Sequence, residues 1–391
     1  MTSQPSPPTT RPLRVAIAGG GIAALEALLA LSADARSLLD MTVVADADDF
    51  LYRSLQVGEP FGLGHPHRYP LAELVDDVGA CFVRARVTGV RPEQHELVLE
   101  HRDPIGYDAL LLALGARSVP AFDHGTVFEP ESYDELLRDV RDNLADDVTV
   151  VVPDGVLWSL PAYELALMTA AWGHAGGATV RIVTCEEGPL AIFGPDASDA
   201  VADRLAEAGV TVVTGVVPDV PQDGLVHTGA HWLPTARVVS LPIPVGPRLS
   251  GVPSTQAGYL ACDQHGRVRS VPDVWAAGDG TAQPIKQGGL AAQQADAAAA
   301  DIARRAGAST RPRPFRPVLR GLLRTQNGPL YLRRSLVGED SAPTVSAEPL
   351  WWPPSKVASR RLTAHLARQD VERAAAPRRL ATGGVVLSTP G

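Results

Sequence analysis

Cysteine, lysine and long apolar runs are scarce in this chain of 391 residues, and each shortage excludes a class of protein. Three cysteines are too few for a disulfide framework and indicate a reducing compartment. No C-x-x-C or C-x4-C pair occurs, which excludes dithiol–disulfide chemistry, and we expect Cys81, Cys185 and Cys262 to be small buried core residues. No apolar run reaches about eighteen residues, so a transmembrane helix is not expected.

Charge is distributed unevenly along the chain. The net charge is −9, and Lys286 and Lys356 are the only lysines beside many arginines. From Arg311 onward there are 14 basic and 5 acidic residues, which leaves −18 for residues 1–310. An acidic body with a basic C-terminal part suits contact with an anionic membrane surface, and a solvated basic tail is the alternative. The acidic body and the lack of a recognition motif argue against nucleic-acid binding.

The first glycine signature lies near the N-terminus. An apolar strand, Val15–Ala18, is followed by a G-x-G-x-x-A sequence and an alanine- and leucine-rich helix. Such a turn lets backbone N–H groups approach a pyrophosphate, with the positive end of the helix facing the phosphates. The pattern predicts a dinucleotide site at Gly19, Gly21, Ile22, Ala23 and Ala24.

The second signature lies roughly 250 residues later, where the apolar strand Val274–Ala277 ends in Gly278 and Asp279. An aspartate in this position can offer its carboxylate to a ribityl chain. The two signatures together favour tightly bound FAD over NAD. An acid at the end of the second strand would hold the ribose, and Asp46 is the candidate, with a solvated turn aspartate as the alternative.

Four further segments complete an ordered pattern. They are Asp49–Arg53, Tyr107–Ala116, Pro284–Ala295 and Leu350–Lys356. With these, the chain over about residues 13–365 resembles the FAD-dependent pyridine-nucleotide oxidoreductase superfamily, on the branch of sulfide:quinone oxidoreductases and type II NADH dehydrogenases. The resemblance implies an FAD enzyme and a homodimer. It also implies that Arg53 lies near the flavin edge, and that Ala113 and Gly115 close the first FAD segment.

The order of predicted strands and helices indicates an α/β fold with two Rossmann-like, three-layer dinucleotide-binding domains, the second inserted in the first. The expected organisation is a disordered leader over residues 1–11, without the apolar core of a signal peptide, and an FAD domain formed by residues 12–125 and 238–310. Residues 126–237 form the inserted NAD(P)-type domain. Residues 311–391 form a tail that contacts a membrane or a second subunit and contains a helix at about Ser355–Ala367.

The inserted domain lacks the glycine loop that would bind NAD(P)H. Its first strand runs into residues 153–161, where one glycine remains and Leu157 and Trp158 occupy the place of a pyrophosphate. Glu164 matches the family's acidic helix position. Glu186 or Glu187 could still hold a ribose, with a solvated strand-end carboxylate as the alternative. Sulfide:quinone oxidoreductases tend to share this loss, although the three cysteines do not fit their sulfur chemistry.

Lys286, Gln287, Gly288 and Gly289 carry the expected chemistry. Reduced flavin bears negative charge at N1 and O2, and a helix N-terminus with a nearby lysine stabilises it. We therefore expect Lys286 and Gln287 to be catalytic, and Lys286, Gly288 and Gly289 also to bind the cofactor. A surface lysine is the alternative for Lys286. No metal site is expected.

Three functions remain open from the sequence. The first is an FAD oxidoreductase that passes electrons from a small reductant to a quinone-type acceptor. The second is an NAD(P)H dehydrogenase with an atypical nicotinamide site, for which NAD(P)H would be a substrate. The third is a non-catalytic FAD-binding protein. The expected location is cytoplasmic, with peripheral contact to the inner face of the cell membrane through residues 311–370. Trp351 and Trp352 could cover the flavin, enter a membrane interface or form dimer contacts.

Overall fold

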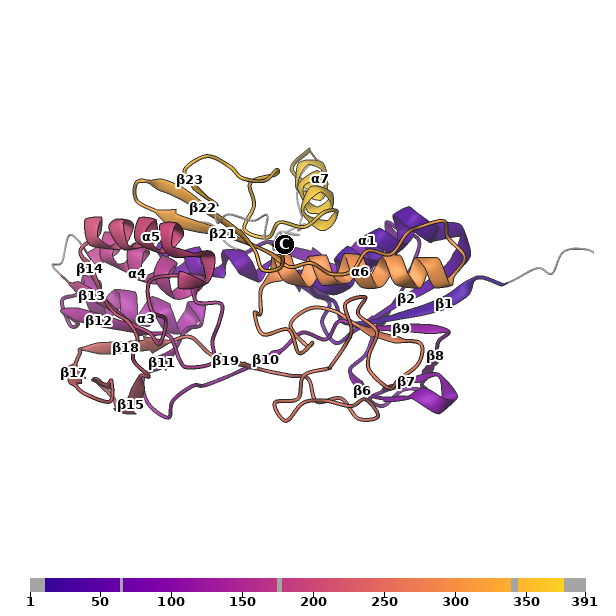
Figure 1. Cartoon of the computed structure of the whole chain (residues 1–391), viewed down its shortest axis with the longest axis horizontal. Coiled ribbons are helices and arrows are strands. Elements are labelled where there is room, and N and C mark those ends of the chain that lie inside the picture. The colour runs from indigo at the N-terminus through magenta and orange to yellow at the C-terminus, as the bar shows by residue number, and fades with distance from the viewer. Residues whose placement is uncertain (1–10, 64–65, 174–177, 339–343, 376–391) are drawn as a thin grey trace, which may run out of the picture.

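The computed structural model describes residues 11–63, 66–173, 178–338 and 344–375. Within these ranges the chain forms two parallel sheets that lie side by side, with a smaller antiparallel sheet and a C-terminal helix on one side of them (Figure 1). The leader expected over residues 1–11 lies outside the described residues, apart from Arg11.

The first parallel sheet has the strand order β20-β9-β1-β2-β5. One face packs on helices α1, α2 and α6, through alternate residues such as Val15 and Ile17. The opposite residues of the same strand, Ala16 and Ala18, face an antiparallel layer and the segment around Leu249. Alternation across both faces gives the three-layer arrangement expected from the sequence. The elements are β1 (Leu13–Ala18), α1 (Ile22–Ala35), β2 (Leu39–Ala45), α2 (Leu71–Asp76), β5 (Cys81–Arg84), β6 (Val87–Arg91), β7 (Glu96–Leu99), β8 (Ile105–Gly106), β9 (Ala109–Leu112), β20 (Val274–Ala276) and α6 (Gly288–Arg305).

The second parallel sheet has the order β11-β18-β12-β13-β14. Val148 and Val150 of β12 face helices α3, α4 and α5, whereas Val151 faces the antiparallel sheet β15-β16-β17. The expected domain boundary at residues 237–238 falls inside β18, so the second sheet continues to Ser240. The elements are β11 (Thr126–Val127), α3 (Pro130–Arg141), β12 (Asp147–Val151), α4 (Leu160–Gly173), β13 (Thr179–Val183), α5 (Pro195–Glu207), β14 (Val210–Val213), β15 (Asp219–Gln222), β16 (Leu225–His227), β17 (Trp232–Pro234) and β18 (Arg237–Ser240).

Two short antiparallel pairs complete the body. One of them, β10-β19, is formed by the two chain segments that pass between the parallel sheets. In the other pair, β3-β4, the chain between the two strands contains the 3₁₀ helix Arg53–Phe61. The strands are β3 (Asp49–Leu51), β4 (Arg68–Pro70), β10 (Arg117–Val119) and β19 (Ile243–Val245).

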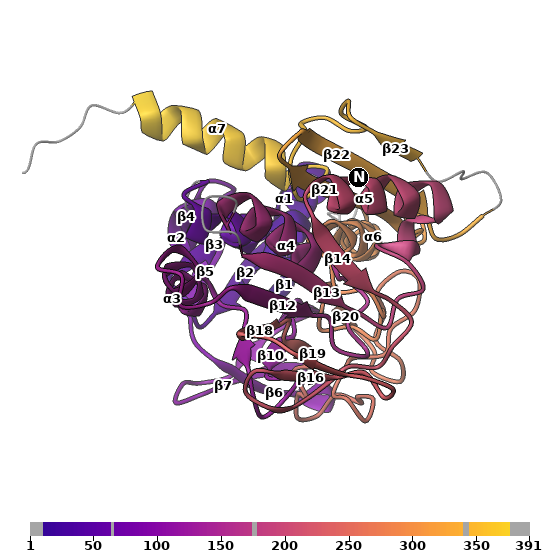
Figure 2. The same ribbon diagram turned by 90° about the vertical axis from the view of Figure 1, so that its left-hand side faces the viewer.

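The C-terminal part is more ordered than the sequence indicates. It forms the antiparallel sheet β21-β22-β23, whose Leu319 and Leu332 are fully buried in the core of the second sheet. Helix α7 begins at Leu362, later than the expected Ser355, and extends beyond the body beside this sheet (Figure 2). The expectation of a tail with one helical stretch therefore missed a sheet. The elements are β21 (Val318–Thr325), β22 (Gly328–Ser335), β23 (Thr344–Ser346) and α7 (Leu362–Ala375).

Two further observations bear on expectations from the sequence. Cys81 is exposed, and Cys185 and Cys262 are half-buried, so the expectation that all three cysteines are buried was wrong. Cys81 begins β5, where its side chain leaves the protein rather than entering the core. Within the described ranges, no helix combines the length and the apolar character needed to cross a membrane.

Candidate functional site

The turn between β1 and α1 contains one glycine that the packing requires and a second glycine that faces open space. Gly19 has φ +126°, and a Cβ there would lie 2.2 Å from the carbonyl oxygen of Ala113, so only glycine fits against the end of β9. Gly21 begins α1 as its N-cap, and a Cβ there would meet nothing within 4 Å. The first turn of α1 carries neither an acidic residue nor a side-chain cap. Its N–H groups therefore face open space, which suits a pyrophosphate.

The two glycine signatures meet in space. Gly278 has φ +85°, and a Cβ there would come within 3.0 Å of the Cβ of Ala23 in the first turn of α1. A Cβ on Gly288 would lie 2.8 Å from Cδ1 of Ile22. The N-termini of α1 and α6 therefore lie against each other, and Ala24 is fully buried below them. Segments that are far apart in sequence form one cradle, whose donors fit an elongated dinucleotide.

The strand-end residues lie around this cradle. Gly115 has φ +69° with open space before it, and its carbonyl oxygen would be 2.9 Å from a Cβ on Gly280. Asp46 is exposed immediately after β2. Asp279 is half-buried beside the N-terminus of α6, where burial raises its pKa and the charge of Lys286 opposes that change.

Lys286 is held in place rather than exposed as a surface lysine. Its Nζ donates hydrogen bonds to the carbonyl oxygens of Thr281 (2.7 Å) and Gln283 (2.6 Å). The same atom stands 3.6 Å from the centroid of the Tyr259 ring, a cation–π contact. Burial lowers the pKa of Lys286 to about 8, although Asp279 opposes this shift.

Gln287 acts on the helix itself. Its side-chain oxygen accepts a hydrogen bond from the N–H of Leu290 (2.8 Å), which makes it the N-cap of α6, and its Nε2 donates to the carbonyl oxygen of Arg320 (3.2 Å). A Cβ on Gly289 would lie 2.9 Å from this Gln287 oxygen. Gln287 is thus placed to orient the N-terminus of α6, which is a positioning role.

A cavity of 430 Å³ lies between the two parallel-sheet regions. Arg53, the first residue of the 3₁₀ helix, and Lys286 line it as its two cations. Glu129 also lines it, but its side chain caps α3 by accepting a backbone N–H in the first turn. The other walls are mostly apolar, including Leu157 and Trp158. A small anionic or polar molecule would meet two cations among mostly apolar walls.

The loop between β12 and α4 is lined by bulky side chains where the sequence predicts a degenerate dinucleotide turn. Gly155 has φ +81°, but Trp158 packs edge-to-face on Phe193, with ring centroids 6.1 Å apart, and Leu157 is half-exposed in the cavity wall. Glu186 is turned inward, because the Tyr163 hydroxyl donates a 2.7 Å hydrogen bond to it. A nucleotide ribose would have to compete with this tyrosine.

A buried ion pair that the sequence does not predict lies between the second sheet region and the C-terminal segment. Lys356 Nζ contacts both carboxylate oxygens of Glu164 and donates to the carbonyl oxygen of Leu322 (2.9 Å). The side chains are 7% and 2% exposed, respectively. Burial lowers the pKa of Lys356, and Glu164 opposes that change. The rarity of lysine was the one available signal, since the only two lysines lie at Lys286 and in this pair.

The tryptophans of the C-terminal segment have different surroundings. Trp351 packs edge-to-face on Tyr331 of β22 at 5.1 Å between centroids, and its Nε1 donates to the carbonyl oxygen of Ser355. Trp352 is 86% exposed. The N–H of Val357 donates to the Tyr52 hydroxyl, and its side chain lies against Gly288, so this segment reaches the N-terminus of α6.

Comparison with protein families decides the class of the molecule. Residues 13–300 match the model of the pyridine nucleotide-disulphide oxidoreductase family. The chain belongs to this family. It is an FAD-dependent oxidoreductase, which sets aside the non-catalytic alternative. Comparison with curated proteins gives no match.

Solved structures with the same fold share little sequence identity with this oxidoreductase. The sulfide:quinone oxidoreductase of the hyperthermophilic bacterium Aquifex aeolicus is 18% identical, with TM-score 0.73 over 93% of this chain and 90% of that one. The ferredoxin reductase for the CYP199A2 system of Rhodopseudomonas palustris is 19% identical, with TM-score 0.63 over 84% and 83%. NDH2 of Plasmodium falciparum, in complex with NADH, is 15% identical, with TM-score 0.57 over 69% and 64%.

Proposed function

We propose that this flavoprotein passes electrons from a small reductant through FAD to a quinone-type acceptor, as a sulfide:quinone oxidoreductase does. The observation that carries the proposal is the cavity between the two sheet regions, which Arg53 and Lys286 line together with the bulky apolar side chains of Leu157 and Trp158. Similarity in fold to the Aquifex aeolicus sulfide:quinone oxidoreductase supports it.

In this proposal the cradle holds FAD, which supplies reversible two-electron chemistry when bound. The first turn of α1, from Gly19 to Ala24, binds the pyrophosphate. Ala113, Gly115, Gly278 and Asp279 contact the ribityl and phosphate parts, and Asp46 the ribose. The N-terminus of α6, with Gly288, Gly289 and Lys286, provides positive potential for the flavin.

The cavity next to this cradle is the proposed donor site. Its walls are mostly apolar, and the Arg53 and Lys286 charges would attract a bound anion. A volume of 430 Å³ with two cations suits a small anionic reductant such as hydrosulfide better than a whole dinucleotide. None of the three cysteines lines the cavity, so a second sulfide would have to take up the oxidised sulfur: two hydrosulfide ions would give one hydrodisulfide ion, one proton and the two electrons that reduce the flavin.

The acceptor is assigned to the side of the C-terminal segment. Trp352 is 86% exposed, and the segment it belongs to reaches the N-terminus of α6 through Val357. An exposed tryptophan in a basic segment is suited to a membrane surface, where a quinone would be available. We therefore propose a cytoplasmic enzyme that contacts the inner face of the cell membrane through residues 311–370, and that forms a homodimer.

An NAD(P)H dehydrogenase with an atypical nicotinamide site is the second candidate. The fold shared with NDH2 of Plasmodium falciparum in complex with NADH favours it. Trp158, packed on Phe193, and Glu186, bonded to Tyr163, stand against it. Replacing Trp158 by glycine should then widen access for a nicotinamide nucleotide.

The deciding experiment follows flavin bleaching of the purified protein under anaerobic conditions with sulfide, NADH and NADPH in turn. We expect sulfide to bleach the flavin and a soluble quinone to restore its colour, whereas neither nucleotide reacts rapidly. The Trp158→Gly variant should gain reactivity with NADH, and Trp158→Phe, which keeps the ring, should not. Rapid bleaching of the wild-type protein by NADH would establish the dehydrogenase instead.

A further inference from the structure

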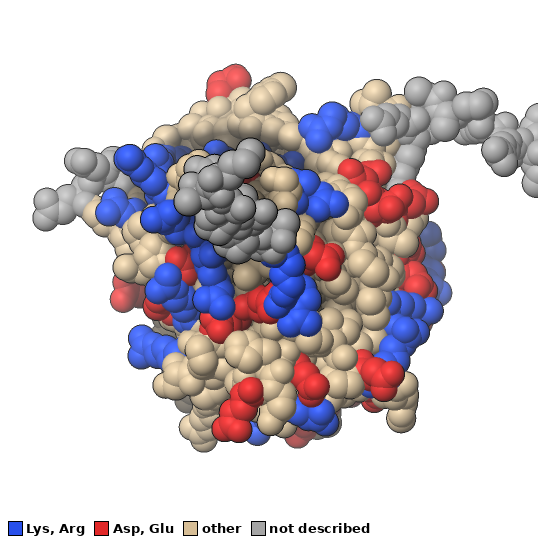
Figure 3. All heavy atoms as spheres, turned by 90° about the vertical axis from the view of Figure 1, so that its right-hand side faces the viewer, with Lys and Arg blue, Asp and Glu red and all other residues tan. Residues whose placement is uncertain are grey.

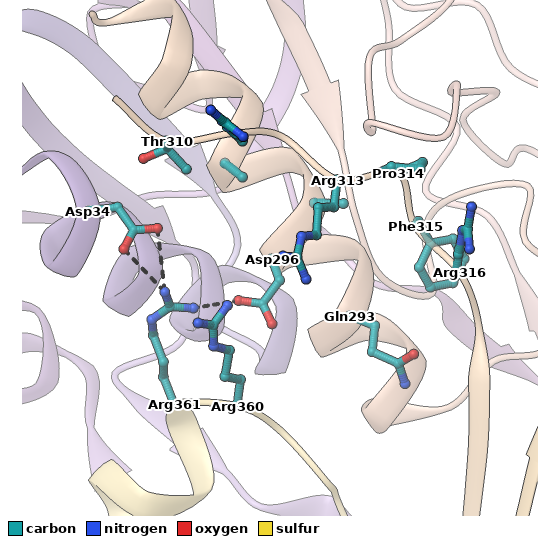
Figure 4. A pocket seen from close by; sticks show the side chains of 13 residues that line it. Asp34, Gln293, Asp296, Thr310, Arg313, Pro314, Phe315, Arg316, Arg360 and Arg361 are labelled. Atoms are coloured by element: carbon teal, nitrogen blue, oxygen red, sulfur yellow. Dashed lines mark hydrogen bonds and ion pairs between the residues drawn. The ribbon is translucent and has the colours of Figure 1, made fainter. Parts of the chain in front are cut away.

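A second hollow lies apart from the cradle and the donor cavity, beside α6. It has a volume of 840 Å³. Gln293 and Asp296 of α6 line it together with residues 310–316, and the residues just before α7 close it from another side (Figure 4). None of its lining residues lines the donor cavity or the cradle, although its arginines belong to the segment 311–370 that we propose contacts the membrane.

The hollow concentrates positive charge. Five arginines and two aspartates line it, an excess of three positive charges in a protein whose net charge is −9. On the end of the molecule shown in Figure 3, acidic and basic side chains are interspersed, as is usual for a solvated surface. The arginines of the hollow are Arg311, Arg313, Arg316, Arg360 and Arg361.

One of the five arginines holds the wall in place. Arg361 donates to Asp296 (2.6 Å) and to Asp34 (3.3 Å), so its one positive charge is shared between two aspartates (Figure 4). Glu26 accepts hydrogen bonds from the backbone N–H groups of Arg361 and Leu362, which fixes the start of α7 against α1. The other four arginines form no ion pair within the described part of the chain.

Three of these four arginines lie on a segment whose backbone is conformationally restricted. Arg311, Arg313 and Arg316 each directly precede a proline, and a residue before proline is restricted to extended backbone. The segment is also anchored, because the N–H of Phe315 donates to the carbonyl oxygen of Gln264 (2.7 Å) and Gln293 bonds both backbone groups of Val318. Little chain entropy is lost when such a wall binds a ligand.

Guanidinium groups in this arrangement fit a phosphate group. Arginine offers planar pairs of N–H donors that bind phosphate oxygens in a bidentate manner, and it keeps its charge at all physiological pH values. In Figure 4, Arg313 and Arg360 extend towards Asp296 from opposite sides. We propose that this hollow is a binding site for a phosphate-bearing anion, contributed by either a soluble phosphate compound or the headgroup of an anionic lipid.

The test uses the purified flavoprotein and two double variants that remove equal charge. Arg313→Gln/Arg316→Gln alters the hollow, and Arg86→Gln/Arg102→Gln removes two exposed arginines elsewhere. Pyrophosphate is titrated at constant ionic strength while the thermal midpoint is followed by flavin fluorescence. A ligand that binds only the native state raises the midpoint in a saturable way. We expect the wild-type protein and the Arg86/Arg102 control to respond alike, and the hollow variant to bind about tenfold or more weakly.

A second arm identifies the source of the phosphate group. Flotation is measured with vesicles of phosphatidylglycerol and, for comparison, of phosphatidylcholine. Binding to phosphatidylglycerol alone that requires Arg313 and Arg316 supports a lipid headgroup, whereas a pyrophosphate response without such flotation supports a soluble compound. The proposal is overturned if both double variants lose binding equally, which indicates general charge attraction, or if the wild-type protein responds to neither probe.

Discussion

Lys356 and Glu164 are separated by 192 positions in the chain, yet they form a buried ion pair. An ion pair in the interior contributes little net stability, because desolvation offsets the attraction between the charges. Removal of either partner, however, would leave the charge of the other buried and unpaired. The pair therefore fixes where the C-terminal segment crosses α4, and with it the position of Val357 against Gly288.

We expect Lys356→Met to lower the free energy of unfolding by about 3–5 kcal/mol, because Glu164 would remain buried without its partner. The measurement is urea denaturation of the flavoprotein at neutral pH. The double variant Lys356→Met/Glu164→Gln serves as the control, because it removes both charges and should recover most of the loss. Equal destabilisation of the single and the double variant would show that the two charges do not act as a pair.

At the scale of elements, the two glycines in the turn from β1 to α1 have different roles. Gly19 serves the fold, because a side chain there would collide with the end of β9. Gly21 has φ −91° and open space before it, so the fold alone does not require glycine there. The remaining reason for glycine at position 21 is that it allows a ligand to approach the first turn of α1 closely.

Two alanine substitutions should therefore differ in kind. Gly19→Ala should destabilise the protein by about 2–4 kcal/mol, since it adds a clash at a positive φ. Gly21→Ala should change the unfolding free energy of the cofactor-free protein little, but reduce the FAD retained per polypeptide severalfold. Urea denaturation and the ratio of flavin to protein absorbance measure the two effects. Full FAD retention by folded Gly21→Ala would contradict the proposed pyrophosphate site.

The elements that the sequence predicts well are those whose pattern is local. The strand–glycine–helix unit at β1 and α1, and the strands and helices from β12 to β14, follow from apolar periodicity and turn residues. The sheet β21-β22-β23 was missed because its strands lie in a proline- and arginine-rich region and show no clear alternation. Their register depends on distant contacts: a Cβ on Gly321 would meet Leu160 at 2.7 Å and Phe193 at 2.8 Å.

In the candidate site, too, some residues can be predicted from local sequence and others depend on tertiary packing. Gly19 and Gly278 could be placed from sequence because a strand-to-helix turn and a positive φ require glycine there, whereas the role of Asp279 stays a prediction. The capping role of Gln287 and the pairing of Lys356 with Glu164 depend on how distant segments pack, which no local pattern contains. The exposure of Cys81 likewise depends on β5 lying at the edge of its sheet.

At the scale of the whole molecule, the C-terminal part is built into the core and is not an appendage. Leu319, Leu323 and Leu332 of β21 and β22 are in the same apolar cluster as the helices of the second sheet. Helix α7 adds Leu362 and Leu366 to the cluster of the first sheet. The described parts of the C-terminal segment, residues 318–338 and 344–375, thus pack on both halves of the molecule, which ties the relative position of these halves to the folding of the segment.

Truncating a side chain in the C-terminal sheet should therefore loosen the second sheet as well. We expect Leu332→Ala, at a fully buried position, to cost about 2–5 kcal/mol, whereas Val337→Ala, at a 46% exposed position, should stay within about 0.5 kcal/mol of wild type. Hydrogen–deuterium exchange should become faster in β21, β22 and also in α4, because these elements share one core. Faster exchange confined to β21–β23 would mean that the C-terminal sheet opens as an independent unit, and that the cradle at α6 keeps its position without it.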